Sequence, residues 1–155
     1  MLELITIPGG LDSNAYVSLE EAEDYMSTLA FKEAWEKADD DQKTAAIIQA
    51  ARWMDTLSWN GLRGSQEQFM AWPRKGAAVD GAEMPENAIP RRVKEANAEF
   101  AFRLLSKDRA GDAEKGISVK GINLPDEERE LVPQSVKDLL GCLLKSNNSI
   151  RLVRS

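Results

Sequence analysis

The residues whose types and spacing could do chemistry lie between Trp59 and Lys75, and that chemistry would be binding to a nucleic acid. Trp59 and Trp72 could each stack an indole ring on a base. The basic residues beside them, Arg63, Arg74 and Lys75, could contact phosphates. Proteins that hold single strands combine these two kinds of contact in one groove. The candidate DNA contacts are therefore Arg63, Trp72, Arg74 and Lys75.

The same tryptophans could instead anchor a hydrophobic core. Trp53 falls on the apolar face of a predicted helix, and Trp35 lies inside another predicted helical segment. Large aromatic side chains contribute much of the area that a small domain buries. We favour this core role for the tryptophans, so DNA binding is the second hypothesis rather than the first.

Groups suited to catalysis are scarce in this chain. It contains no histidine, which removes the commonest general base and the commonest metal ligand. Cys142 is the one cysteine, and its apolar setting LLGCLL predicts a small buried side chain rather than a reactive thiol. The sequence has no glycine-rich motif of the kind that holds phosphates. We therefore expect a protein that is not an enzyme and needs no cofactor.

Asp39, Asp40 and Asp41 are three consecutive carboxylates, which raises the hypothesis of a metal site. Consecutive side chains point in different directions, however, and the segment lacks the alternating spacing and the glycine of a calcium loop. Carboxylates also cap helices and stabilise the positive end of the helix dipole. We therefore predict that this segment begins a helix, and we predict no metal site.

Length and composition predict one domain with its own core. The chain has 155 residues, of which 43% are hydrophobic and 30% are charged. No apolar stretch approaches the ~20 residues of a membrane-spanning helix, and the N-terminus does not resemble a signal peptide. The net charge of −6 does not favour a protein whose main task is holding a nucleic acid backbone. We expect a soluble intracellular protein that binds no membrane.

The stretch from Trp72 to Leu105 organises the predicted fold. Its first part is a loop interrupted by prolines and glycines, and ordered loops of this length are usually functional. Pro90 then opens an amphipathic helix, because the first helical N–H has no partner in any case. The apolar residues of this helix recur at helical spacing on one face. They are Val93, Ala96, Phe100, Ala101 and Leu104.

Helices are also predicted on both sides of this stretch. The segments before it are 18–30, 31–38 and 41–59, and the segment after it begins at Pro133. Ser18 with Glu21 forms a capping box, and Gly61 should end the third segment. The last helix has a regular apolar face. That face consists of Val136, Leu139, Leu140, Leu143 and Leu144.

These elements predict a mainly α fold, a small bundle of about four to five helices. A long inter-helix loop, a short β segment at 117–122 and an extended C-terminal arm complete it. We expect residues 1–110 to form the helical core with an N-terminal arm. Residues 111–155 would then form an appendage with the β segment, the last helix and the tail.

Several short motifs occur along the chain in a specific order. They are Tyr16–Ala22 (YVSLEEA), Trp59–Gly61 (WNG), Trp72–Arg74 (WPR), Ile89–Pro90 with Val93–Ala96 (VKEA), and Val132–Pro133 with Val136 and Leu139–Leu140. This order resembles the head-to-tail adaptor (head completion or connector) proteins of tailed phages. Members of that family are often labelled DnaT-like single-stranded-DNA-binding proteins. The resemblance spans nearly the whole chain, with one departure at Gly141-Cys142, where a Pro-Tyr-like pair is expected.

The resemblance implies a structural role in the neck of a virion. Such adaptors form a ring, commonly of twelve subunits, between the portal and a downstream tail or stopper protein. Double-stranded DNA passes through the ring without specific binding, and an acidic subunit suits a channel wall that repels phosphates. The competing hypotheses are a single-stranded-DNA-binding protein of replication or recombination, and an unrelated helical interaction module.

Two sets of residues are the expected contacts of the adaptor. The C-terminal arm is the expected portal contact, because an extended segment can add as a strand to a partner's sheet. The arm residues are Ile150, Arg151, Leu152, Val153 and Arg154. The long loop is the expected contact with a neighbouring subunit or tail protein. Its residues are Trp72, Pro73, Arg74, Lys75, Met84 and Pro85.

Overall fold

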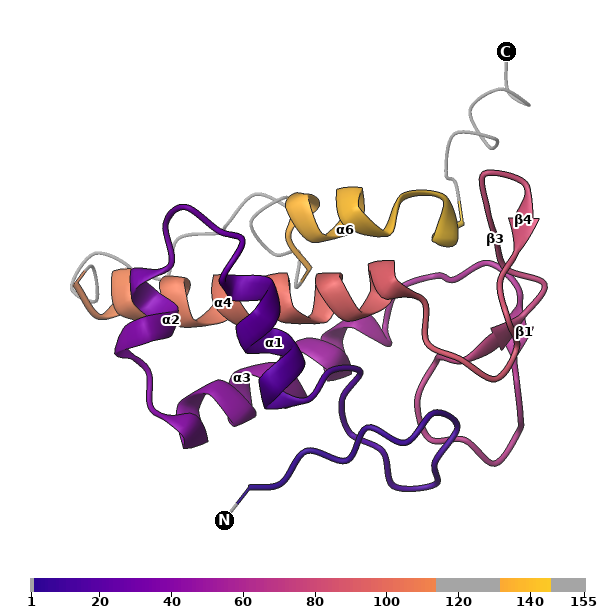
Figure 1. Cartoon of the computed structure of the whole chain (residues 1–155), viewed down its shortest axis with the longest axis horizontal. Helices are drawn as coiled ribbons and strands as arrows, with labels where there is room; N and C mark the ends of the chain where they lie inside the picture. Colours follow the sequence, from indigo (N-terminus) through magenta and orange to yellow (C-terminus); the bar gives the residue numbers. More distant parts are fainter. Residues whose placement is uncertain (1, 114–131, 146–155) are drawn as a thin grey trace, which may run out of the picture.

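The computed structural model describes residues 2–113 and 132–145 (Figure 1). Within them the α-helices are α1 (Leu19–Met26), α2 (Glu33–Lys37), α3 (Asp40–Met54), α4 (Arg91–Ala113) and α6 (Gln134–Leu140). The strands are β1 (Leu62–Arg63), β2 (Arg74–Lys75), β3 (Ala78–Val79) and β4 (Ala82–Glu83), and a 3₁₀ turn η2 spans Gly141–Leu143. The predicted mainly α fold is confirmed. No helix in the described ranges has the length and hydrophobicity to cross a membrane.

Helix α4 is the centre of the fold. It runs along the long axis of the molecule, and it contacts α1, α2, α3 and α6 (Figure 1). Val93, Ala96, Phe100 and Ala101 on its predicted apolar face are fully buried. The helix that follows Pro90 therefore supplies the surface on which the other helices pack, as its periodicity predicted.

The first and third helices begin within one residue of the predicted start but end earlier, and α2 spans only Glu33–Lys37 instead of 31–38. Both predicted N-caps are present: Ser18 forms a capping box with Glu21, and Asp39 forms one with Gln42. The prediction that the third helix extends to residue 59 was wrong, because α3 ends at Met54. The Thr56 hydroxyl donates to the Trp53 carbonyl at 2.6 Å, and such local bonds compete with the helical hydrogen-bond pattern.

The last helix packs on the same core as the others. Val136, Leu140 and Leu143 are fully buried, and α6 lies along α4 (Figure 1). The expectation of a buried Cys142 was wrong: its side chain is exposed, because Leu140 and Leu143 occupy the inward positions on either side. Gly141 ends the α-helix with a positive φ of 51°. The predicted strand at 117–122 lies outside the described residues.

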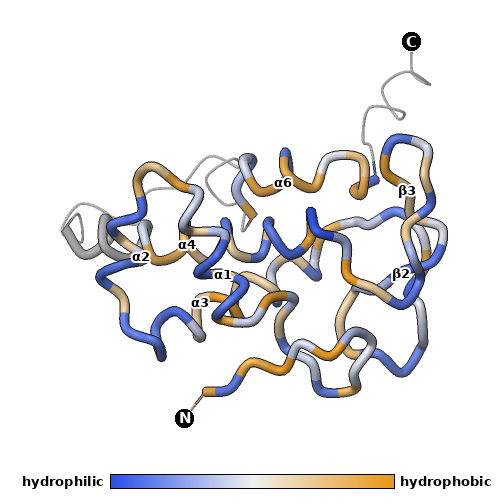
Figure 2. The backbone as a smooth tube through the Cα atoms, viewed as in Figure 1, coloured by the Kyte–Doolittle hydropathy of each residue, from blue (hydrophilic) through white to orange (hydrophobic). Residues whose placement is uncertain are grey.

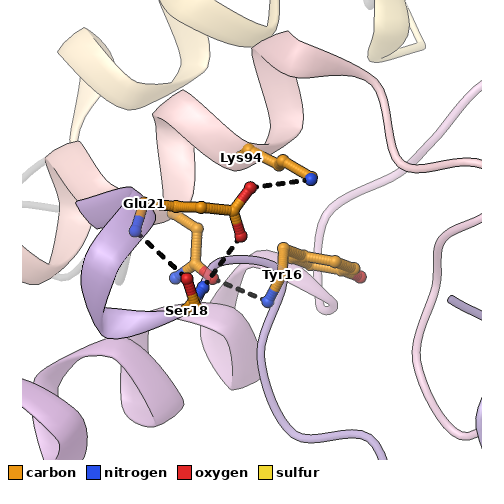
Figure 3. A network of polar contacts seen from close by, with 5 residues as sticks. Tyr16, Ser18, Glu21 and Lys94 are labelled. Carbon is orange, nitrogen blue, oxygen red and sulfur yellow. Dashed lines mark hydrogen bonds and ion pairs between the residues drawn. The ribbon is translucent and has the colours of Figure 1, made fainter. Parts of the chain in front are cut away.

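The segment leading into α1 is held to α4 by buried and surface polar contacts (Figure 3). The amide of Tyr16 donates to the side-chain oxygen of Asn97, which is fully buried, at 2.9 Å. Glu21 accepts from the Ser18 amide and pairs with Lys94 at 2.9 Å. One carboxylate therefore caps α1 and joins it to α4, and these contacts lower the pKa of Glu21 against the opposing effect of its partial burial.

Candidate functional site

The two tryptophans that could stack on bases lie in the core. Trp59 is 4% exposed and Trp72 is 1% exposed. Their ring centroids are 5.5 Å apart and the ring planes meet at 89°, an edge-to-face arrangement. Trp35 is buried as well, whereas Trp53 is half-buried and packs against Phe100. Neither Trp59 nor Trp72 presents a ring face to solvent on which a base could stack.

The Arg74 side chain joins the segment that follows α3 to the segment that precedes β2. Its Nε donates to the Asn60 carbonyl at 2.8 Å, and one terminal nitrogen donates to the Gly61 carbonyl at 2.8 Å. The other terminal nitrogen donates to the Ala71 carbonyl at 3.1 Å. Partial burial lowers the pKa of this guanidinium below its usual value. All three nitrogens bind the protein's own backbone, so Arg74 positions the loop rather than offering a free cation.

Gly61 permits the close approach of β2 to the start of β1. Leu62 pairs with Lys75 and Arg63 pairs with Arg74 in this short antiparallel ladder. The φ of Gly61 is +80°, and a Cβ there would lie 2.3 Å from the Lys75 carbonyl oxygen. Only glycine fits this backbone. Gly61 was expected to end a helix, but it lies beyond the end of α3 and belongs to the turn that begins the strand pair.

A partly buried polar cluster lies beneath the loop. The Tyr16 hydroxyl donates to one oxygen of Asp55, and the Ala71 amide donates to the other at 3.3 Å. The Trp72 amide in turn donates to the Tyr16 hydroxyl at 3.2 Å. Burial raises the pKa of Asp55 to about 6, and burial together with the Asp55 charge raises the pKa of Tyr16. Three segments distant in sequence thus meet at one carboxylate.

Sequence reasoning missed this cluster because neither residue stood out. Tyr16 precedes a capping box, and Asp55 fell within the predicted third helix, which was expected to continue to residue 59. A carboxylate on a helix is usually solvated, so no pattern marked Asp55 as partly buried. Its partial burial follows from the early end of α3, which directs the chain into the loop that covers it.

The end of the described chain is joined to the start of the loop. The Asn60 side chain donates to the carbonyls of Cys142 and Leu144, at 2.8 and 3.1 Å. The Asn60 amide donates to the Leu143 carbonyl and the Lys145 amide donates to the Ser58 carbonyl, both at 2.9 Å. Residues 58–60 therefore hold residues 142–145 against the core.

Some of the predicted contact residues are exposed to solvent and others are buried. Lys75, Pro85 and Arg63 are exposed, whereas Met84 is half-buried. Like Trp72, Pro73 is buried, and the peptide bond between them is cis. The Arg63 guanidinium donates to the Gln68 carbonyl. Of the four candidate DNA contacts, two basic residues on adjacent strands thus remain accessible. The arm residues 150–154 lie outside the described residues.

No metal site appears where the acidic run suggested one. Asp39 accepts from the Gln42 amide at 2.8 Å as the N-cap of α3, and Asp40 and Asp41 occupy the first turn. In the ranges that the structure describes, no three acidic, cysteine or histidine side chains come together in a way that could hold an ion. The carboxylates therefore stabilise the beginning of a helix.

Comparison with known proteins identifies a family. No curated protein and no solved structure matches the chain. A family model matches residues 6–155, and its description is "Putative DnaT-like ssDNA binding protein". This is the label expected from the order of the sequence motifs. Because the match covers nearly the whole chain, the protein belongs to this DnaT-like family.

Proposed function

We propose that this protein is a structural adaptor of a tailed bacteriophage, which forms a ring between portal and tail and continues the DNA channel. The observation that supports this function best is that the side chains of Trp72 and Arg74 are both occupied within the protein. The tryptophan fills the core and the arginine binds three backbone carbonyls, so both build a rigid loop instead of a groove for bases.

The partners of this proposed ring follow from the same assignment. The C-terminal arm, residues 150–154, would contact the portal protein, and the loop from Lys75 to Pro85 would face a neighbouring subunit or a tail or stopper protein. Double-stranded DNA would pass through a ring of twelve copies without specific binding. A net charge of −6 per subunit suits a wall that does not retain phosphates. The protein would act in the virion neck and catalyse no reaction.

The family description favours a second candidate function, binding to single-stranded DNA. Arg63 and Lys75 are exposed on the adjacent strands β1 and β2 and would supply the phosphate contacts. Binding through two cations without an accessible aromatic ring would be weak and strongly dependent on salt. Trp72 and Arg74 would influence such binding only through the shape of the loop.

Co-sedimentation distinguishes the two functions. The full chain is mixed with portal rings encoded by the same phage in one series and with a single-stranded oligonucleotide in another. We expect co-migration with portal rings and little retention by DNA at physiological salt. A chain truncated after Asn147 should lose portal binding while its melting temperature stays unchanged, and continued portal binding would contradict the role of the arm.

The opposite result would establish the second function. Retention by the oligonucleotide alone, lost at high salt and weakened by a combined Arg63→Ala and Lys75→Ala change, would replace the adaptor with a single-strand binder. Glu83→Ala on β4 provides a matched control, because this exposed residue should not contribute to phosphate binding.

A further inference from the structure

The N-terminal arm contains a segment, residues 3–7, that belongs to no strand of the described structure. We refer to residues 3–7 as the arm edge. Their sequence (ELITI) is rich in β-branched side chains, which favour strands. Figure 2 shows the arm as a largely hydrophobic stretch that runs outside the helices. Leu4 packs partly against the core, whereas Glu3 and Ile7 are exposed.

One side of the arm edge is hydrogen-bonded to the turn that follows it. The Asn14 amide donates to the Ile5 carbonyl, and the Asn14 side-chain oxygen accepts from the Ile5 amide, both at 2.9 Å. The Asn14 side-chain nitrogen donates to the Glu3 carbonyl at 3.0 Å. The Gly10 amide donates to the Ile7 carbonyl at 3.0 Å. Alternate residues therefore bond on the same side, as they do in an extended strand.

The other side of the arm edge has no partner in the described residues. In an extended chain the backbone groups of successive residues point to opposite sides, so those of Leu4 and Thr6 point away from Asn14. Within residues 2–113 and 132–145, no hydrogen bond reaches the N–H or the C=O group of Leu4 or Thr6. Backbone groups without a protein partner are normally bound to water. The arm therefore presents an open strand edge, which another strand can complete through backbone hydrogen bonds.

The side chains of the arm edge define which strand fits beside it. Residues directly opposite each other on paired strands are in contact. The fitting strand therefore needs a basic residue opposite Glu3. It also needs apolar residues opposite the large apolar side chains, which are Leu4, Ile5 and Ile7.

The charge of the arm also favours a basic partner. Residues 2–14 include two exposed carboxylates, Glu3 and Asp12, and no lysine or arginine. The neighbouring loop is bonded to the arm through the Phe69 amide. Residues 62–70 of this loop carry one exposed residue of each sign, Arg63 and Glu67, so they do not cancel the charge of the arm.

The sequence of residues 150–154 has the required pattern. In an antiparallel register the five pairs are Ile150 with Ile7, Arg151 with Thr6, Leu152 with Ile5, Val153 with Leu4, and Arg154 with Glu3. Three of these pairs join two apolar side chains, and one joins opposite charges. Cross-strand pairs of both kinds stabilise a sheet.

The position of α6 indicates that a second copy supplies this strand. Figure 1 shows α6 and the N-terminal arm on opposite sides of α4. The Lys145 amide is held by the Ser58 carbonyl at 2.9 Å, and four residues separate Lys145 from Ile150. This stretch spans at most about 18 Å when fully extended. The segment of the same chain would have to pass around the core within that length.

We infer that residues 150–154 of one copy pair as an antiparallel strand with the arm edge of another copy. The inference goes beyond the proposed function, because it needs only a second copy of the chain. It would also stand if the protein bound single-stranded DNA. Portal rings should compete with this pairing, since one segment cannot pair with two partners at once.

Sedimentation velocity over a range of concentrations up to about 1 mM tests the pairing. The segment has far fewer than the roughly 20–30 residues of a stable interface, so association should be weak. We expect the wild-type chain to form dimers or larger species as its concentration rises. Thr6→Pro and Val153→Pro should each remain monomeric, because proline removes one N–H donor of the pairing. Thr6→Val and Val153→Thr are the matched controls, since both keep the amide and should associate like the wild type.

Mixing the two proline variants identifies the two surfaces. A Thr6→Pro copy keeps its C-terminal segment and a Val153→Pro copy keeps its arm edge, so the mixture should form heterodimers. Hydrogen exchange at the Leu4 and Thr6 amides should slow when the wild-type chain associates. The Ile5 amide is already bonded to Asn14 and should change little. Unchanged melting temperatures should show that the variants are folded.

Four results would overturn the inference. These are a wild-type chain that stays monomeric throughout, a proline variant that associates like the wild type, a mixture that forms no heterodimer, and slow exchange of the Leu4 and Thr6 amides in the dilute monomer. The portal experiment is separate. Association of the free chain without portal binding would preserve the pairing and reject the adaptor, whereas portal binding by a chain that never self-associates would do the reverse.

Discussion

At the scale of single residues, Arg74 illustrates why a guanidinium is needed in the loop. Its three nitrogens reach the carbonyls of Asn60, Gly61 and Ala71, which lie in different directions. A lysine has one nitrogen on a flexible stem and cannot reproduce this geometry. A lysine would keep the positive charge but could not hold the loop in place.

We predict that Arg74→Lys and Arg74→Ala both lower the free energy of unfolding by roughly 2–4 kcal/mol, the loss expected for several charge-assisted hydrogen bonds. Urea denaturation measures the change. Lys75→Ala is the matched control, since that neighbour is exposed and should alter stability by less than about 0.5 kcal/mol. A lysine variant as stable as the wild type would show that only charge is required.

Asp55 makes stability depend on pH. Burial raises its pKa in the folded protein to about 6, above the ordinary value of 3.8, despite the opposing effects of Tyr16, the Ala71 amide, Arg63 and Arg74. The folded state therefore binds a proton more tightly than the unfolded state does. The resulting stabilisation is fully present below pH 3.8 and is lost as the pH rises through about 6.

We predict that Asp55→Asn removes this pH dependence. In the wild type the group should contribute roughly 2 kcal/mol more stability at pH 4 than at pH 7, because most of a shift of about two pKa units is realised over this range. Urea denaturation of both proteins between pH 4 and 7 isolates this contribution, because the other titrating groups are the same. Parallel stability curves for the two proteins would contradict the assignment.

At the scale of elements, Asn97 ties three segments together inside the core. This fully buried residue of α4 accepts from the Tyr16 amide at 2.9 Å and donates to the Ile47 carbonyl at 3.1 Å. The N-terminal arm and α3 are thereby fixed to the same point on α4. A buried polar residue forms its hydrogen bonds only when the neighbouring segments are correctly aligned. It therefore fixes their alignment more strictly than apolar packing alone does.

We predict that Asn97→Leu destabilises the fold by roughly 1–3 kcal/mol, because the buried Tyr16 amide is left without its partner and the Ile47 carbonyl, which lies within α3, loses its additional bond to Asn97. Thermal unfolding measures the loss, and hydrogen exchange at the Tyr16 amide should accelerate. Arg91→Ala on the same helix is the control, since its side chain is 89% exposed. Slow exchange at Tyr16 in the leucine variant would show that the arm is held by other contacts.

At the scale of the whole molecule, the C-terminal helix belongs to the core. Val136, Leu140 and Leu143 are fully buried, and Asn60 joins the end of the loop to residues 142–144. Burial of three such side chains contributes roughly 5–9 kcal/mol. That amount is comparable to the entire stability of a typical domain.

We predict that a chain ending at residue 131 does not fold cooperatively, although it retains α1 to α4. Circular dichroism should show a broad, non-cooperative thermal transition, and tryptophan fluorescence should show Trp59 in solvent. The chain that ends at Asn147 keeps α6 and should melt like the full protein. A sharp transition for the shorter chain would instead support a self-sufficient core within residues 1–110.

The sequence by itself determined the class of fold and its central helix. Apolar residues at helical spacing located α3, α4 and α6, and Ser18 and Asp39 located two helix starts. These features depend on residues a few positions apart, so they can be seen without the rest of the chain. The ordered motifs also indicated the family that the match over residues 6–155 identifies.

Only the tertiary structure decided what the loop residues do. A tryptophan near an arginine in sequence is compatible with a surface on which bases stack and with a packed turn. Which of the two forms depends on contacts across more than 40 positions of the chain, such as the one between Tyr16 and Trp72. The exposure of Leu62 and Phe69 was likewise invisible in sequence, because burial is decided by what the rest of the chain covers. Local pattern specified the elements, and long-range packing specified which side chains remained at the surface.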